Sequence, residues 1–238
     1  MNTIKSLFIY TLTSMLLISV SLVIALVYNT QISQSAQVSI SFQRRTAVLD
    51  PGHGGKDGGA ISVTGSTEKE LNLSVSIALR DVLTVLGYDV IMTRDSDVEL
   101  THADGGTRKM QDLKGRLEIL SQHQEAPFIS IHMNKFPISK YSGAQIYYTV
   151  NNDQGLQLAK TVRSSIIDLL QTDNERNTKP SNSSIYLLHK AKSPAILIEC
   201  GFLSNDEEAK LLDDEIYQIK LASVIASGIN MWYNGYHL

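Results

Sequence analysis

Two histidines and a glutamate stand where short apolar segments of the chain end. His53 lies at the tip of the turn DPGHGG, which follows the apolar residues 47–49. His132 follows the apolar run FISI, and Glu199 follows the run AILI. Ligands bind beyond the carboxyl ends of strands in open α/β sheets, so we expect these three side chains to meet at one site.

A second glutamate lies at the start of the first long helix that the sequence predicts. The segment TEKE, residues 67–70, is a capping box in which Thr67 caps the helix and Glu70 folds back to the cap's backbone. Glu70 therefore has a structural task. Glu68 has none, and it is predicted to point from the first helical turn toward the glycine-rich turn.

These side chains are typical of a catalytic zinc centre. Such a centre takes imidazole nitrogens or carboxylate oxygens from three protein ligands and keeps a fourth position for water. We predict that His53, Glu68 and His132 bind Zn2+ and that Glu199 carries the proton. Considered alone, His53 could simply belong to a tight loop, His132 could be a core histidine, and Glu199 could form an ion pair with Arg94. The combination of all four favours a site.

Three further residues could contact substrate or support the metal ligands, namely Asn134, Arg94 and Asn205. For the two asparagines, loop capping is at least as good an interpretation. Arg94, like Arg116, is more simply interpreted as a loop brace. Cys200 is adjacent to Glu199, but neighbouring strand residues point to opposite faces, so its thiol is expected in the core.

Apolar runs alternate with longer segments of helical periodicity, which is typical of an α/β fold. We expect one domain with a central twisted sheet, mostly parallel or mixed, flanked by helices and preceded by an N-terminal hydrophobic helix. The predicted strands cover residues 47–49, 90–92, 128–131, 146–148, 185–188 and 195–198. The predicted helices cover residues 68–86, 113–122, 153–170 and 206–233, the last broken near Asp213. Residues 95–112 and 172–184 form long loops of the kind that carry function.

Composition sets limits on the partners. The net charge is −3 and no Lys/Arg run occurs, which argues against nucleic acid. Cys200 is the sole cysteine, so no disulfide can form within the chain.

The apolar residues are concentrated at the N-terminus. Residues 7–27 are long and apolar enough to span a bilayer, and no charged residue occurs from 6 to 43. Lys5 before this stretch favours a cytoplasmic N-terminus and an exported body. We therefore predict a signal or membrane-anchor segment at residues 1–28, a polar tether at 29–45 and a catalytic domain at 46–238. An anchor is favoured over signal cleavage because the stretch is long for a cleaved peptide.

Five segments carry a resemblance to a known family. LDPGHGGKDGGA, GSTEKELNL, VIMTRDSD, FISIHMN and ILIECGFLSN resemble, in order, the motifs of the zinc-dependent N-acetylmuramoyl-L-alanine amidases of the Amidase_3 type. The resemblance runs from about Thr46 to Trp232. It implies that His53, Glu68 and His132 bind zinc and that Glu199 is catalytic. Glu70 stands where the family commonly has Asp.

The resemblance also implies the reaction and its setting. The implied activity is hydrolysis of the amide between the N-acetylmuramoyl lactyl group and L-alanine of peptidoglycan. The short architecture resembles the spore-cortex amidases that act in germination, which implies work beside a peptidoglycan deacetylase in making muramic δ-lactam. An exported activator protein is a further partner that the sequence leaves open. The alternatives are an inactive peptidoglycan-binding regulator, and a metallopeptidase or deacetylase acting on the same polymer.

Overall fold

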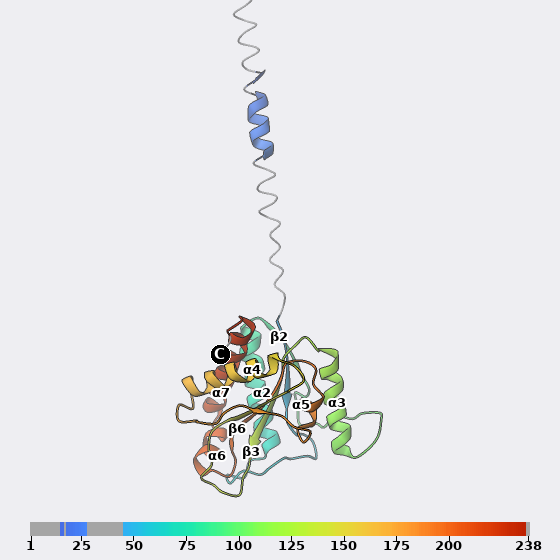
Figure 1. Cartoon of the computed structure of the whole chain (residues 1–238), viewed down its shortest axis with the longest axis vertical. Coiled ribbons are helices and arrows are strands. Elements are labelled where there is room, and N and C mark those ends of the chain that lie inside the picture. The colour runs from blue at the N-terminus through green and yellow to red at the C-terminus, as the bar shows by residue number, and fades with distance from the viewer. Residues whose placement is uncertain (1–14, 17, 28–44, 237–238) are drawn as a thin grey trace, which may run out of the picture. The chain divides into compact units, whose positions relative to one another are not determined.

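The apolar runs of the sequence become the strands of one six-stranded sheet. The computed structural model describes residues 15, 16, 18–27 and 45–236. Contacts divide the chain into two units, Met1–Gln43 and Arg44–Leu238, and the sheet lies in the second (Figure 1). Its strands are β1 (Arg45–Pro51), β2 (Tyr88–Met92), β3 (Phe128–Asn134), β4 (Gln145–Tyr148), β5 (Lys179–Pro180) and β6 (Ala195–Phe202).

The strand order places the predicted site residues at one edge. The order is β2-β1-β3-β6-β4-β5, with β2, β1, β3 and β6 parallel and β4 antiparallel to β6. The carboxyl ends of β1, β3 and β6 therefore lie side by side. In this register His132 is the direct neighbour of Glu199. The predicted α/β fold with a mostly parallel, mixed sheet is confirmed.

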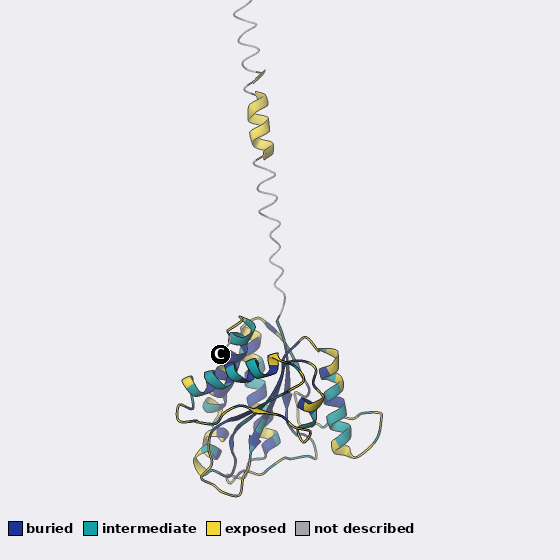
Figure 2. Ribbon diagram, viewed as in Figure 1, coloured by how far each residue is buried: buried dark blue, intermediate teal, exposed yellow. Residues whose placement is uncertain are grey.

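Helices cover both faces of the sheet. One face carries α2 (Glu68–Val85), α4 (Gln154–Leu169) and α7 (Glu215–Tyr233), and the other carries α3 (Arg108–Gln122) and α5 (Tyr186–Lys190). The short helix α6 (Asp206–Asp213) follows β6. Figure 2 shows the strands as the buried layer between these helices.

Strand alternation decides which side chains are buried and which reach the site. In β3, Ile129, Ile131 and Met133 belong to the core beneath α2, α4 and α7. Each such side chain contributes about 1.5–3 kcal/mol through burial. The residues between them, Ser130 and His132, consequently point to the opposite side. Cys200 is fully buried in the larger core, as predicted.

Local signals place the ends of α2 correctly. The capping box forms, because the Thr67 backbone N–H donates to Glu70 Oε2 over 3.2 Å and the Thr67 hydroxyl donates to the same oxygen over 2.7 Å. The helix ends before Gly87, which has a φ of 86° that glycine adopts without strain.

Several predictions of secondary structure were wrong, and one of them is the loop of residues 172–184, which contains the short strand β5. Residues 185–188 are predicted to be a strand, but Ile185 is the N-cap of α5 and the other three begin this helix, whose Leu187 and Leu188 pack into the smaller core. A short apolar run does not distinguish a strand from one buried helical turn. The helix predicted from residue 113 begins at Arg108, because the Thr107 side chain caps it by accepting from the Met110 N–H. The break in the last predicted helix lies at Asp214, between α6 and α7.

At the N-terminus, residues 18–27 are helical and exposed. In the part of the chain that the structure describes, no helix combines the length and apolar character needed to cross a membrane. The predicted span at residues 7–27 lies partly outside the described residues, and residues 28–44 lie wholly outside them.

Candidate metal centre

β1 brings His53 to the carboxyl edge of the sheet through a turn that two arginines hold. His53 has a φ of 60°, which is uncommon for a residue other than glycine. Arg116 donates to the carbonyl oxygens of His53 and Pro51 over 2.6 and 2.8 Å. Arg94 donates to those of Pro51 and Gly52, both over 2.9 Å. These bonds fix the backbone from which the imidazole projects.

Arg116 is itself fixed by a buried carboxylate. Asp50 accepts hydrogen bonds from Arg116 over 2.6 Å, from the Ser130 hydroxyl over 2.6 Å and from the Thr93 hydroxyl over 2.7 Å. Burial would raise the pKa of Asp50, but the charge of Arg116 and these hydrogen bonds outweigh it and lower the pKa. The buried pair therefore stays ionised near neutral pH.

Close packing in the turn requires glycine at two positions. A Cβ on Gly52 would lie 2.2 Å from the His132 ring. A Cβ on Gly59, whose φ is 66°, would lie 2.6 Å from Glu68 Oε2. The glycines thus allow the backbone to wrap the predicted ligands at a distance that any larger residue would prevent.

The three predicted ligands converge. His53 Nε2 lies 3.2 Å from Glu68 Oε1, and His132 Nδ1 lies 3.0 Å from the same oxygen. One donor atom from each residue lies within 4.8 Å of the others. The two rings meet edge to face, with centroids 5.1 Å apart. This is the one such group among the residues that the structure describes.

Backbone groups hold the carboxylate of Glu68 in place. Its Oε2 accepts from the Ala60 N–H over 2.9 Å, and its Oε1 accepts from the Met133 N–H over 3.3 Å. Glu70 is occupied in the capping box on the exposed side of the helix. The structure therefore separates the two glutamates in the way that local capping predicts.

The site's charges favour a metal ion. Burial would raise the pKa of Glu68, but hydrogen bonds and charge from His132 and His53 lower it strongly. Burial would lower the pKa of His53, but Glu68 and Asp57 outweigh it and raise the pKa. The site thus keeps a carboxylate ionised beside two imidazoles, and a divalent cation would displace protons from the imidazoles.

Asp57 is a site residue that the sequence reasoning missed. Its Oδ2 lies 3.0 Å from His53 Nδ1, on the side of the ring away from Glu68. A carboxylate in this position orients a ligating histidine and fixes its tautomer. The signal in the sequence is an acidic residue four positions after His53 in the same glycine-rich segment.

Glu199 lies beside the ligands but makes different contacts. Its neighbours in the sheet are His132 on β3 and Gln145 on β4. Its Oε2 is buried and has no hydrogen-bond partner among the described residues. Burial raises its pKa, the charge of Glu68 adds to the rise, and His132 and His53 oppose it. A carboxylate whose pKa is raised in this way holds a proton more readily than an exposed one.

The remaining predicted site residues lie near this edge with structural contacts of their own. Arg94 donates to four backbone carbonyl oxygens, and the structure gives it no ion pair with Glu199. Asn205 caps α6 by accepting from the Glu207 and Glu208 N–H groups. Asn134 ends β3, where its carbonyl oxygen accepts from the Leu203 N–H.

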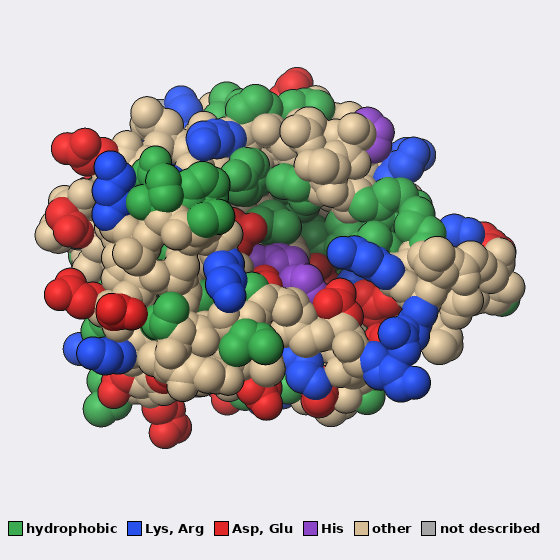
Figure 3. All heavy atoms as spheres, turned by 90° about the horizontal axis from the view of Figure 1, so that it is seen from below, with side chains coloured by type: hydrophobic (Ala, Val, Ile, Leu, Met, Phe, Trp, Pro, Cys, Tyr) green, Lys and Arg blue, Asp and Glu red, His purple; other side chains and the backbone are tan. Residues whose placement is uncertain are grey.

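The converging ligands lie in an accessible hollow. Figure 3 shows histidine side chains at its bottom, with hydrophobic side chains along one wall and charged side chains around the rim. His102 instead lies in the loop before α3, where it faces Asp104 and Glu118. The donor set of two imidazole nitrogens and one carboxylate oxygen, with a buried carboxylate beside it, fits a bound divalent metal.

The fold and the candidate site together fit a metal-dependent enzyme whose site lies at the carboxyl edge of an α/β sheet. Residues 47–231 match the N-acetylmuramoyl-L-alanine amidase family, Amidase_3. The chain therefore belongs to this family, whose members hydrolyse an amide bond of peptidoglycan, and the predicted family is confirmed.

Individual relatives support this assignment. The germination-specific N-acetylmuramoyl-L-alanine amidase of Bacillus subtilis is 39% identical over 202 residues, which cover 82% of each chain. The CwlD amidase of Clostridioides difficile, solved in complex with the GerS lipoprotein, is 39% identical and superposes with a TM-score of 0.76 over 80% of this chain and 99% of that one. AmiC2 of Nostoc punctiforme is 31% identical, with a TM-score of 0.70 over 80% and 97%.

Proposed function

We propose that His53, Glu68 and His132 hold Zn2+ and that the chain uses it to cleave the amide between the muramoyl lactyl group and L-alanine. The observation that carries this proposal is the convergence of the three donor atoms within 4.8 Å. Imidazole nitrogen and carboxylate oxygen suit zinc. When bound, zinc supplies a Lewis acid for a carbonyl oxygen and lowers the pKa of water.

Glu199 is the proton carrier in this proposal. It takes a proton from water as the water oxygen attacks the carbonyl carbon of the amide. It then gives that proton to the alanine nitrogen as the carbon–nitrogen bond breaks. The raised pKa of Glu199, caused first by burial, suits a group that must both accept and release a proton.

The supporting residues act by position. Asp57 orients the ring of His53, and Arg116 holds the carbonyl oxygen of the same residue. Neither needs to contact the substrate. Their contribution is to hold the donor atoms where the cation binds, so that little reorganisation is required.

Metal analysis of the full-length protein tests the centre. We expect about one zinc per chain in the wild type, as in other sites with three protein ligands. His53→Ala should lose it. His102→Ala is the matched control, because His102 lies outside the cluster, and it should keep the metal. Equal zinc content in both variants would remove His53 from the ligand set.

Product analysis tests the bond that is cleaved. Mass spectrometry of digested peptidoglycan should show free stem peptides that begin at L-alanine. Shortened stems would indicate a peptidase, and free glucosamine would indicate a deacetylase. An intact polymer in the presence of zinc would indicate a binding protein without activity.

We further propose a role in the spore cortex, beside a peptidoglycan deacetylase that completes muramic δ-lactam. The support is the 39% identity to the germination-specific amidase of Bacillus subtilis. Expression in a Bacillus subtilis strain that lacks this amidase should restore δ-lactam to the cortex, whereas a Glu199→Gln variant should not. Absence of δ-lactam with the active protein would argue for another role.

The fold is compatible with an exported enzyme that is anchored upstream. Arg45, where β1 begins, is held by Asn230 and Asn234 over 2.8 and 2.7 Å. The metal centre lies beyond the other end of β1, about 20 Å along the strand. We propose that residues 1–28 hold the chain at the outer side of the cytoplasmic membrane. Fractionation before and after removal of these residues tests this placement.

An exported activator protein is the remaining proposed partner. The support is that the CwlD amidase of Clostridioides difficile was solved in complex with a lipoprotein. Co-purification of the full-length chain with exported lipoproteins of its own organism, followed by zinc analysis of the complex, tests this partner. A zinc content and activity that no such protein alters would argue that the chain works alone.

A further inference from the structure

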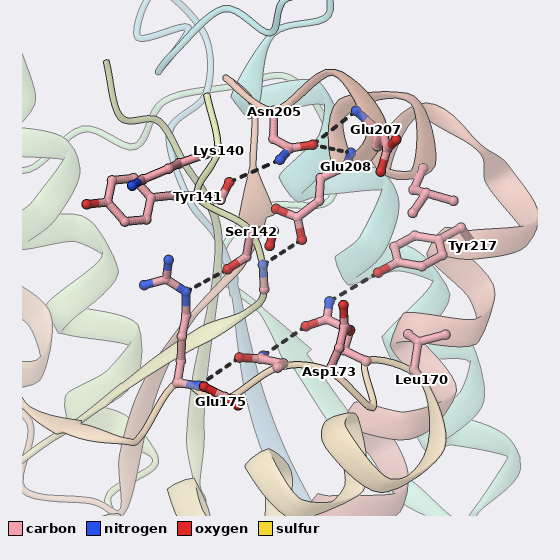
Figure 4. A pocket seen from close by; sticks show the side chains of 15 residues that line it. Lys140, Tyr141, Ser142, Leu170, Asp173, Glu175, Asn205, Glu207, Glu208 and Tyr217 are labelled. Atoms are coloured by element: carbon pink, nitrogen blue, oxygen red, sulfur yellow. Dashed lines mark hydrogen bonds between the residues drawn. The ribbon is translucent and has the colours of Figure 1, made fainter. Parts of the chain in front are cut away.

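A pocket lies beside the segment that follows β6, where Asn205 lines it. Its volume is about 700 Å3, and it is bounded by residues 140–143 of the β3–β4 connection, residues 170–176 after α4, and the start of α6. Figure 4 shows Lys140 and Tyr141 on one side of it and Leu170 and Tyr217 on the other. The residues just described as metal ligands do not line it.

Arg176 is the basic group that this pocket holds most firmly. Its guanidinium lies 4.6 Å from the centre of the Phe202 ring and 5.8 Å from that of Tyr141. Its Nε donates to the Ser142 carbonyl oxygen over 2.7 Å, and its own carbonyl accepts from Arg163. Among the described residues no carboxylate lies within ion-pair distance of it. The terminal nitrogens of a stacked, oriented guanidinium suit a carboxylate ligand.

The acidic residues of the pocket narrow the choice of ligand. Glu208 accepts from the Gly143 and Phe202 N–H groups, both over 2.8 Å, and so has a structural task. Asp173, Glu175 and Glu207 are exposed at the rim. These carboxylates repel a multiply charged free anion such as phosphate. A single carboxylate carried by a peptide experiences less repulsion and still meets Arg176.

Arg176 and Glu199 are connected through β6 and β4. Phe202, on which Arg176 stacks, follows Glu199 by three positions in β6, with a bulge between them. Gln145, the neighbour of Glu199 on β4, donates over 2.6 Å to the carbonyl oxygen of Asn177, the residue after Arg176. The charges of Glu199 and Arg176 both influence Tyr147. Burial and Glu199 raise the pKa of Tyr147, and Arg176 lowers it.

We propose that Arg176, stacked on Phe202 and Tyr141, binds a free carboxylate of the stem peptide whose bond is cleaved. Arg176 is thus a specificity residue that selects stems with a free carboxylate. This inference depends on the proposed amide cleavage, because it names the part of the same substrate that the pocket recognises.

The experiment compares two forms of one substrate. Glycan strands with stem peptides are acetylated on their free amino groups, and half of the material is then amidated on its carboxylates. kcat and KM are measured with the full-length, zinc-loaded protein, with Arg176→Met and with Arg176→Lys. Arg80→Met is the matched control, because Arg80 pairs with its neighbour Asp81 on the exposed side of α2.

We expect Arg176→Met to lower kcat/KM on the carboxylate substrate by about tenfold to a hundredfold, mostly through KM, since a hydrogen bond between charged groups is lost. Amidation of the substrate should lower kcat/KM of the wild type by a similar factor. On the amidated substrate, Arg176→Met and the wild type should have equal kcat/KM, which also shows that the variant is folded. Arg176→Lys should fall between them, and Arg80→Met should match the wild type.

Two results would overturn the inference. If Arg176→Met lowers kcat/KM equally on both substrates, the role of Arg176 is structural. If it lowers kcat/KM on neither substrate, Arg176 has no role in binding. Failure of the wild type to release any stem peptide would instead refute the proposed cleavage, so the two failures are distinct.

Discussion

Asp50 on β1 and Glu199 on β6 are both buried carboxylates at the carboxyl edge of the sheet, but their surroundings are opposite. Where β1 ends, Asp50 accepts three side-chain hydrogen bonds, and Arg116 donates to two carboxylates and two backbone carbonyls. Where β6 passes the site, Glu199 has a buried oxygen without a hydrogen-bond partner among the described residues. The first arrangement fixes the geometry of the turn, and the second leaves a buried carboxylate oxygen without a partner in the described part of the chain, as the proposed role of proton carrier requires.

The same difference explains the opposite directions of the pKa shifts. Both carboxylates are buried, and burial alone raises the pKa of each. At Asp50 the charge of Arg116 reverses the effect, whereas at Glu199 the nearby Glu68 adds to it. The groups that face a buried carboxylate thus decide whether its pKa is lowered, as at Asp50, or raised, as at Glu199.

The largest expected effect is on catalysis at the Glu199 end. Glu199→Gln should lower the rate of stem-peptide release by about a hundredfold to ten-thousandfold, because the amide cannot carry the proton. Zinc content should stay at the wild-type level, since Glu199 lies outside the ligand cluster. The melting temperature should not fall, because a neutral amide is less costly to bury than a carboxylate. Retained hydrolysis in this variant would remove Glu199 from the role.

The next effect concerns stability at the β1 end. Arg116→Met should lower the free energy of unfolding by about 3–5 kcal/mol, because it leaves Asp50 buried without its counter-charge. Urea unfolding measures this change. The control Arg80→Met replaces an exposed arginine paired with Asp81 and should stay within about 0.5 kcal/mol of the wild type. Equal changes in the two variants would contradict the assigned role of the Asp50–Arg116 pair.

Replacement of Asp57 should change the affinity for zinc and have little effect on the stability of the fold. Asp57→Asn weakens the contact with His53 Nδ1, so zinc affinity should fall by about tenfold to a hundredfold. Competition with a chelator measures this affinity. Asp81→Asn, in an exposed ion pair far along α2, is the control and should bind zinc as the wild type does. Unchanged affinity in Asp57→Asn would show that the carboxylate does not orient the ring.

The smallest expected effect is the pH dependence of the stability that Asp50 contributes, because it is seen only in acid. Because the folded state lowers the pKa of Asp50 below its unfolded value of about 3.9, the pair stabilises the fold above that pH. Its contribution should be lost as the pH falls through the lower, folded pKa. The difference in unfolding free energy between the wild type and Asp50→Asn should therefore be constant above about pH 5 and shrink below about pH 4. A difference that grows on acidification would contradict this linkage.

Much of the site could be predicted because its signals are local. His53, His132 and Glu199 each follow an apolar run, and parallel strands bring such endings to one edge. The choice of Glu68 over Glu70 needed only the capping box, whose atoms lie within four residues. The same local patterns gave the strands β1, β2, β3, β4 and β6, and the extent of α2.

Residues 185–188 mark the limit of local patterns. Their apolar character fits a strand, yet Ile185 is the N-cap of α5 and the other three start this helix, since what decides their conformation is the space between α3 and the sheet. The tight pairing of Asp50 with Arg116 spans 66 positions in the sequence. No periodicity or motif within a window of the chain reports a contact of that kind.

By itself, the sequence determined the family and the alternation of strands and helices, and it predicted the candidate ligands, because these depend on residue identity and on neighbours a few positions away. Only the tertiary structure decided that Asp57 backs His53, that Arg116 clamps the turn, and that Arg176 lies stacked on Phe202. The physical reason is that these roles depend on distance, burial and opposing charge, and these arise only when distant segments pack together.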